Sequence, residues 1–185
     1  GLDSADLSPV RRALDLILSS HDPYPAFVLN PAWDILQANR SHHRLLELLY
    51  PGAGSLPDPV NALRLLFDPD LLKSSVGNWE TVAHVLGNRV REQMRAPNLS
   101  DELRARFQEL LDYPGVREAM AQVSPPADAA VLVPLELDLQ GRRLSWFSTI
   151  ATIGTPQDVT LEEHRIESMF PADESTANIV NALVP

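Results

Sequence analysis

The residues best suited to metal chemistry form two clusters of histidine and glutamate. His42 and His43 are adjacent, and the run Glu162-Glu163-His164 is followed by Glu167. Neighbouring residues of a helix point about 100° apart, so His42 and His43 cannot both hold one ion from one helix face. On a strand, Glu163 and Glu167 would share a face but lie roughly 13 Å apart, which is too far for one ion. We therefore predict no metal site at either cluster, and a solvated helix surface at His42 and His43.

Catalytic motifs are absent from the sequence. The chain contains no GxSxG, HExxH, GxGxxG or P-loop pattern. It also contains no cysteine, which excludes disulfides, thiolate metal sites and a thiol nucleophile. Acidic residues are plentiful, but a general acid–base pair needs burial and a shifted pKa, which spacing alone does not reveal. We predict that the protein is not an enzyme and that it takes no cofactor.

A second group of residues is suited to binding a small molecule. Ligand pockets are mostly apolar with a few polar anchors. Arg64 and Arg89 lie on helices whose other residues point inward, and an arginine can hold a carboxylate by two parallel hydrogen bonds. The alternative is a salt bridge for each arginine and ordinary core packing for each apolar residue. The predicted ligand-binding residues are Phe27, Trp33, Leu63, Arg64, Phe67, Trp79, Val82, Leu86, Arg89, Trp146 and Phe147.

Composition limits the classes of protein that the chain can belong to. Its 185 residues, of which 44% are hydrophobic and 22% charged, suit one globular domain. Fifteen basic and 25 acidic residues give a net charge of −10, which argues against free-standing nucleic-acid binding. No run of 18 apolar residues and no signal peptide are visible, so we expect a cytoplasmic protein that does not enter membranes.

Helical periodicity and breaker residues predict the helices that must position these side chains. Asn39 or Ser41 is expected to cap the second helix, and Asn78 the fourth. The predicted helices cover residues 9–20, about 40–50, 61–67, 79–95, from 100 to about 112, 116–122 and 173–183.

Two hairpins are predicted at opposite ends of the chain. Residues 26–29 and 34–39 are short apolar runs around an Asn-Pro turn, and residues 135–140 and 144–153 flank a Gly turn. Residues 158–170 are ambiguous between strand and helix, and we favour a strand at 161–170. Strand edges must pair, so the fold class is α+β, with an antiparallel sheet of about five strands covered on one face by helices.

Four segments carry a family resemblance in their order and spacing. They are YPAFVLNPAWDILQAN, NALRLLFDP, NWETVAHVLGNRVR and DVTLEEHRIESMFPADEST. Together they resemble the MmyB-like transcription regulator ligand-binding domain, over about Leu7 to Leu183. Many members carry a His-Pro element in the sheet, whereas this chain has Val133-Pro134-Leu135.

The resemblance implies a PAS-like domain of a bacterial regulator. Residues 1–6 would be a tag scar or linker and residues 7–185 the ligand-binding domain, with an N-terminal XRE-type helix-turn-helix domain absent from the chain. The expected ligand is a small apolar or carboxylate molecule, such as a fatty acid. DNA would be bound only through the missing domain, and the helix at 9–20 would support a homodimer. The alternative is a dimerisation or protein-interaction module without a small-molecule ligand.

Overall fold

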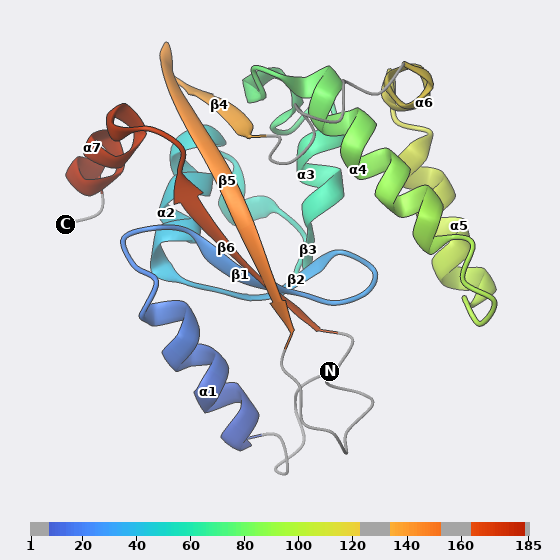
Figure 1. Ribbon diagram of the computed structural model, residues 1–185, viewed down its shortest axis with the longest axis horizontal. Coiled ribbons are helices and arrows are strands. Elements are labelled where there is room, and N and C mark those ends of the chain that lie inside the picture. The colour runs from blue at the N-terminus through green and yellow to red at the C-terminus, as the bar shows by residue number, and fades with distance from the viewer. Residues whose placement is uncertain (1–7, 123–133, 153–163, 184–185) are drawn as a thin grey trace.

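An antiparallel sheet forms the centre of the fold (Figure 1). The computed structural model describes residues 8–122, 134–152 and 164–183. Within these ranges six strands pair in the order β3-β2-β1-β6-β5-β4. The strands are β1 Ala26–Leu29, β2 Asp34–Ala38, β3 Val60–Asn61, β4 Leu135–Leu139, β5 Arg142–Thr152 and β6 Arg165–Pro171. The α+β class is confirmed, with the short strand β3 in addition to the five expected.

Seven helices of the described chain surround this sheet. They are α1 Ser8–Ser19, α2 Arg40–Leu49, α3 Ala62–Phe67, α4 Trp79–Gln93, α5 Asp101–Leu111, α6 Val116–Ala121 and α7 Glu174–Leu183. Each matches a helix predicted from periodicity to within a few residues at its ends. Two short 3₁₀ turns, Ala53–Ser55 and Lys73–Ser75, were not expected from the sequence.

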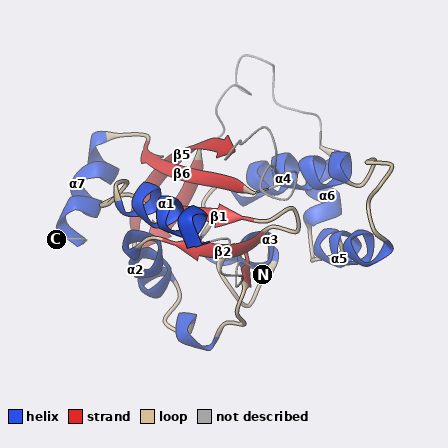
Figure 2. Ribbon diagram, turned by 90° about the horizontal axis from the view of Figure 1, so that it is seen from below, coloured by secondary structure: helices blue, strands red, loops and turns tan. Residues whose placement is uncertain are grey.

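The two faces of the sheet pack against different helices. On β1, Phe27 and Leu29 join the main core beneath the helices α2 to α6. Ala26 and Val28 point the other way, into a smaller cluster with α1. Figure 2 shows α1 lying across this second face. The sequence predicted helices on only one face of the sheet. Strand β1 is instead buried on both faces, because α1 packs against the second face.

The central strand β6 joins the two halves of the chain. It pairs with β1 on one side and with β5 on the other. The ambiguous segment 158–170 is therefore a strand from Arg165 onward, as favoured, while residues 158–163 lie outside the described residues. Residues 1–6, expected to be a scar or linker, also lie outside them.

Two asparagines predicted as helix caps have different roles. Asn39 caps α2, because its side chain accepts a hydrogen bond from the His42 backbone N–H. Asn78 makes no side-chain cap on α4, so that prediction was wrong. Its amide instead donates to the Pro134 carbonyl at 2.6 Å and accepts from the Glu136 N–H at 3.1 Å. It thereby ties the start of α4 to strand β4.

Candidate functional site

Two adjoining apolar cavities lie between the sheet and the helices. Their volumes are about 90 and about 110 Å³. They share the lining residues Phe27, Ala62, Leu66, Leu135 and Met169. The first cavity extends beneath α2, and the second extends towards α4 and strand β5. Strands and helices from both halves of the sequence therefore build two cavities that share part of their lining.

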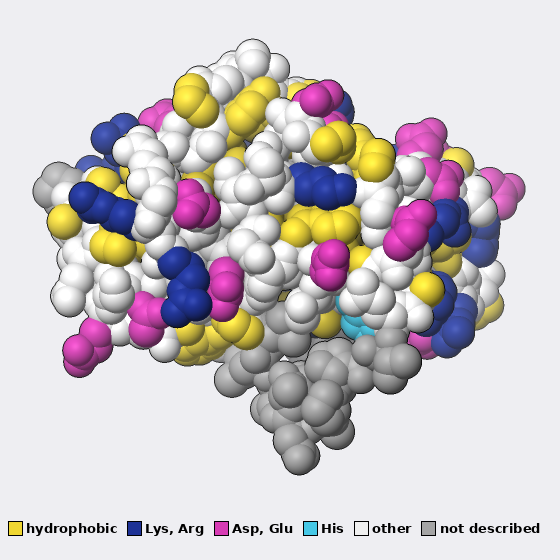
Figure 3. All heavy atoms as spheres, turned by 90° about the horizontal axis from the view of Figure 1, so that it is seen from above, with side chains coloured by type: hydrophobic (Ala, Val, Ile, Leu, Met, Phe, Trp, Pro, Cys, Tyr) yellow, Lys and Arg dark blue, Asp and Glu magenta, His cyan; other side chains and the backbone are white. Residues whose placement is uncertain are grey.

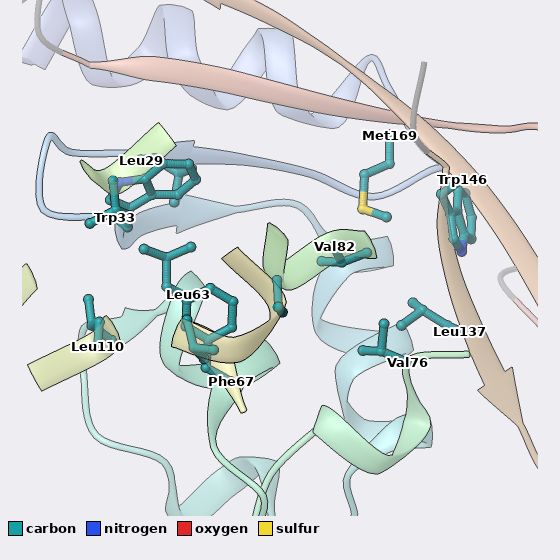
Figure 4. Packing of buried hydrophobic residues seen from close by; sticks show 14 of the residues in the cluster. Leu29, Trp33, Leu63, Phe67, Val76, Val82, Leu110, Leu137, Trp146 and Met169 are labelled. Carbon is teal, nitrogen blue, oxygen red and sulfur yellow. The ribbon is translucent and has the colours of Figure 1, made fainter. Parts of the chain in front are cut away.

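Tryptophan and methionine side chains from the sheet and from the turn before β2 form the floor of the second cavity. Met169 points from β6 towards the helices, with Trp33 and Trp146 to either side (Figure 4). Trp33 has a φ of 68°, in the left-handed region that is uncommon for a large residue. Its indole N–H donates to Gln93 Oε1 at 2.7 Å, which links the turn before β2 to the end of α4. The ring orientation is therefore fixed from both ends.

The structure brings six of the eleven predicted ligand-binding residues together on the second cavity. These are Phe27, Trp33, Leu63, Leu86, Trp146 and Phe147. Phe67 and Val82 are buried in the adjacent core and line neither cavity. Trp79 packs at the edge of that core, with Lys73 over its ring and its N–H bonded to the Leu66 carbonyl at 2.7 Å. Contact of these residues with a ligand stays a prediction.

The two predicted arginine anchors lie outside both cavities. Arg64 pairs with Asp68 at 3.4 Å, the salt bridge that was its alternative role. It faces a separate polar groove of about 340 Å³ that Arg106 also lines. Arg89 is exposed on α4. Both helices do point apolar residues inward, but these two positions fall on the outer side of the stripe.

The prediction that His42 lies on a solvated helix surface is wrong. The ring lines the first cavity and packs on Phe27, with the two ring centroids 5.0 Å apart. Burial, with a further contribution from the charge of His43, lowers the pKa of His42 to about 4. His42 is therefore a neutral side chain at pH 7. His43, the next residue, is exposed as expected.

Polar groups gather at one end of the second cavity. Ser148 donates to Glu167 at 2.7 Å, and both residues line the cavity. On the same face of β6, the Arg165 guanidinium stacks over Trp33 at 4.3 Å. Burial, and then the nearby charge of Arg89, lower the pKa of Arg165. This end of the site offers a hydroxyl and a carboxylate, and the Arg165 guanidinium lies next to it over Trp33.

No group of three or more histidine, aspartate or glutamate side chains within residues 8–122, 134–152 and 164–183 is arranged to hold a metal ion. Within the same ranges, no helix is both long enough and apolar enough to cross a membrane. Acidic, basic and apolar side chains are interspersed on the face shown in Figure 3.

An antiparallel sheet that encloses an apolar cavity beneath a helical layer is the architecture of a PAS-like, ligand-binding domain. The family model for the MmyB-like transcription regulator ligand binding domain matches residues 10–183. The chain therefore belongs to this family of ligand-binding domains of transcription regulators. No curated protein matches the chain.

Proposed function

We propose that the chain is the ligand-sensing domain of a bacterial XRE-family regulator and binds a small apolar or fatty-acid-like molecule. The observation that carries this proposal is the pair of adjoining cavities with almost entirely apolar linings. Such a site favours apolar ligands because binding removes hydrocarbon surface from water. In the parent protein, a helix-turn-helix domain before residue 7 contacts DNA.

The volumes of the two cavities limit the size of the ligand. Small-molecule sites usually enclose about 300–1,000 Å³, whereas these cavities enclose about 90 and about 110 Å³. A molecule of eight to ten heavy atoms is the class that we propose for the site as it stands. Leu45, Leu46 and Leu49 of α2 line the first cavity and are only partly buried. Their movement would admit a longer chain.

Native mass spectrometry of protein purified from several expression hosts tests ligand binding. We expect an additional mass that is lost on denaturation and belongs to a small lipophilic molecule. Protein that carries no such mass from any host, and that takes up no C8 to C14 amphiphile on incubation, would overturn the proposal.

The regulatory step follows from the energetics of coupled states. A ligand shifts the arrangement of two DNA-binding domains only through its different affinity for the two arrangements. Measuring operator affinity of the full-length regulator with and without the bound lipophile tests this step. Unchanged operator affinity would exclude the switch and leave ligand binding intact.

A second candidate function, dimerisation through α1, is supported by an exposed apolar patch. Leu16 and Ile17 are 67% and 43% exposed, while Leu14 and Leu18 on the same helix are buried against the sheet. We propose a second copy of this chain as the partner, because closed two-fold contacts are the commonest assembly. Light scattering should give a dimer for the unsubstituted chain and a monomer for the double variant Leu16→Glu with Ile17→Glu. Ile150→Glu, at an exposed position on β5, is the control.

A further inference from the structure

One face of strand β6 carries Arg165, Glu167 and Met169, because alternate residues of a strand share a face. Met169 lines both cavities and Glu167 lines the second. Ile166 points the other way, into the cluster with α1. The Arg165 guanidinium lies over the ring of Trp33, a further lining residue. Over roughly 13 Å, the length of four strand residues, this face therefore passes from an apolar interior to a polar end.

The Nη2 atom of Arg165 is buried and has no hydrogen-bond partner among the described residues. Every guanidinium nitrogen carries hydrogen and can only donate, so Nη2 requires an acceptor. Buried polar atoms are nearly always paired. Arg106 shows the ordinary case, because its two terminal nitrogens donate to the two carboxylate oxygens of Asp34 at 2.7 and 3.2 Å. Arg165 lacks the carboxylate that Arg106 has.

The charges around Arg165 also call for an anion. Burial lowers its pKa most, the charge of Arg89 lowers it further, and Glu167 acts in the opposite direction. Glu167 already accepts the Ser148 hydroxyl at 2.7 Å. Among these described groups, two guanidinium groups and one carboxylate leave a surplus of one positive charge. A partly buried charge is stabilised by an opposite charge that also accepts its hydrogen bonds.

The opposite end of the site, in the first cavity, suits hydrocarbon. His42 is the titratable residue of its lining, and a pKa of about 4 leaves the ring neutral at pH 7. The other residues that line this cavity are apolar. A charged group there would lose its hydration without gaining a counter-charge from the lining. The two ends of the site therefore favour opposite ends of an amphiphilic molecule.

We propose that Arg165 holds the carboxylate of an aliphatic acid at the polar end of the second cavity, with the hydrocarbon chain running past Met169 towards α2. This inference rests on the proposed function, since it requires that the cavities hold an apolar chain. A carboxylate fits a guanidinium by two parallel hydrogen bonds and supplies the single negative charge. Rotation about the side-chain bonds of Arg165 would present Nη2 to the cavity. Arg165 thus takes the anchoring role that the sequence suggested for Arg64 and Arg89.

Two probes of equal size test the proposal on the whole chain at pH 7.5. Octanoate carries the charge, and octanamide keeps the chain length and the carbonyl group but is neutral. Isothermal titration calorimetry measures both affinities without depending on the fluorescence of Trp33. We expect the unsubstituted chain to bind octanoate about tenfold more tightly than octanamide, the contribution of about one charge-assisted hydrogen bond.

The variant Arg165→Met keeps an unbranched stem over Trp33 and removes the guanidinium. We expect it to lose the preference for octanoate while still binding octanamide. The matched control is Arg142→Met, at an exposed position at the start of β5, which should keep the preference. Equal affinities of the two probes for the unsubstituted chain, or an unchanged preference in Arg165→Met, overturns the role of Arg165 and leaves the proposed function standing.

A measurement on the unsubstituted protein covers the case in which Arg165→Met does not fold. In a proton–nitrogen NMR spectrum, the Nε–H signal of Arg165 should shift on addition of octanoate, while that of Arg142 stays in place. An unshifted Arg165 signal with octanoate bound overturns the proposal. If neither probe binds and native mass spectrometry finds no lipophile, the proposed function fails together with it.

Discussion

Two polar residues at the start of α2 differ in whether their buried polar atoms are hydrogen-bonded. Asn39 is buried, yet its side chain is paired with backbone atoms of three neighbouring segments. His42, three residues later, is partly buried, and its buried Nδ1 atom has no hydrogen-bond partner among the described residues. The first arrangement stabilises the fold, because every polar atom keeps a partner. The second leaves one ring nitrogen without a partner among the described residues, beside an apolar cavity.

The depressed pKa of His42 predicts a pH dependence of stability. The folded pKa is about 4 and the ordinary value is 6.5, so the unfolded chain takes up the proton first as pH falls. The free energy of unfolding is therefore complete above pH 6.5 and decreases between pH 6.5 and 4, by about 3 kcal/mol for this residue. His43 is the charged neighbour that contributes to the lowered pKa of His42. The side chains from β1, α3 and β4 that line the first cavity are apolar. Urea unfolding at pH 4.5 and 7 measures the difference.

Carboxylates titrate over part of the same range, so a comparison of variants isolates the histidine. His42→Phe should lose less stability than the parent chain on acidification, whereas His43→Phe should keep most of the parent's loss, because burial is the larger cause of the lowered pKa of His42. Parallel losses in all three proteins would show that His42 is not buried in its neutral form.

Removing the side chain of Asn39 should be strongly destabilising. Asn39→Ala deletes the cap of α2 and leaves the buried Ala26 N–H and Tyr24 carbonyl without their partner. A lost cap costs about 1 kcal/mol, and each buried group left unpaired adds about 1–3 kcal/mol. We expect a loss of about 3 kcal/mol or more in urea unfolding. Asn98→Ala, at an exposed position, should change stability by less than about 0.5 kcal/mol.

Asn39 and His42 differ in how well the sequence alone predicts their surroundings. The cap at Asn39 was predictable because capping depends on residues within one turn of the chain. The burial of His42 was not, because it depends on Phe27, Leu66 and Met169, which lie in other elements. The arginine anchors were misplaced for a related reason: helical periodicity does not resolve the edge of an apolar stripe.

At the scale of elements, helix α1 is an amphipathic helix with two unequal apolar sides. Leu14 and Leu18 pack on the second face of the sheet, whereas Leu16 and Ile17 face outward. The helix itself was predictable from its 3.6-residue period. Its docking on the face of the sheet opposite the other helices was not, because both faces of β1 are apolar and periodicity carries no information about which face a distant helix covers.

Truncating the two sides of α1 should have different consequences. Leu14→Ala removes a side chain that is 2% exposed and should destabilise the protein by about 3 kcal/mol, through lost burial and a residual cavity. Leu16→Ala, at a position 67% exposed, should change the stability of the monomer by less than about 0.5 kcal/mol. Guanidinium unfolding at low protein concentration measures both. Similar losses would mean that α1 is not docked through Leu14.

The whole molecule brings the two ends of the sequence together around the cavities. Phe27 comes from the first hairpin, and Leu135, Trp146 and Met169 come from the last third of the chain. Strand pairing between β1 and β6 makes this possible. The two hairpins were predictable because each is local. The sequence alone did not reveal that the apolar site consists of two adjoining cavities, nor that His42 lines the first of them.

Ala62 lies between the two cavities, so a substitution there tests whether a ligand occupies them. It lines both cavities at the first residue of α3, so a larger side chain there should fill shared space. A ligand at a hundred times its dissociation constant stabilises the folded state by about 2.7 kcal/mol, or roughly 5–10 °C in Tm for a chain of this length. With 1-octanol as the probe, we expect this rise for the parent chain and little or none for Ala62→Phe.

The control for this experiment is Ala105→Phe, an exposed position on α5 that should keep the full rise in Tm. Ala62→Phe need not be less stable without ligand, because the added ring buries apolar surface in space that is otherwise empty. Its Tm without ligand therefore separates a filled cavity from a damaged fold. A full ligand-induced rise in Ala62→Phe would place the bound molecule elsewhere on the protein. Its loss, with the fold retained, would locate the ligand at the junction of sheet and helices, where residues of α2 and β6 line the cavities.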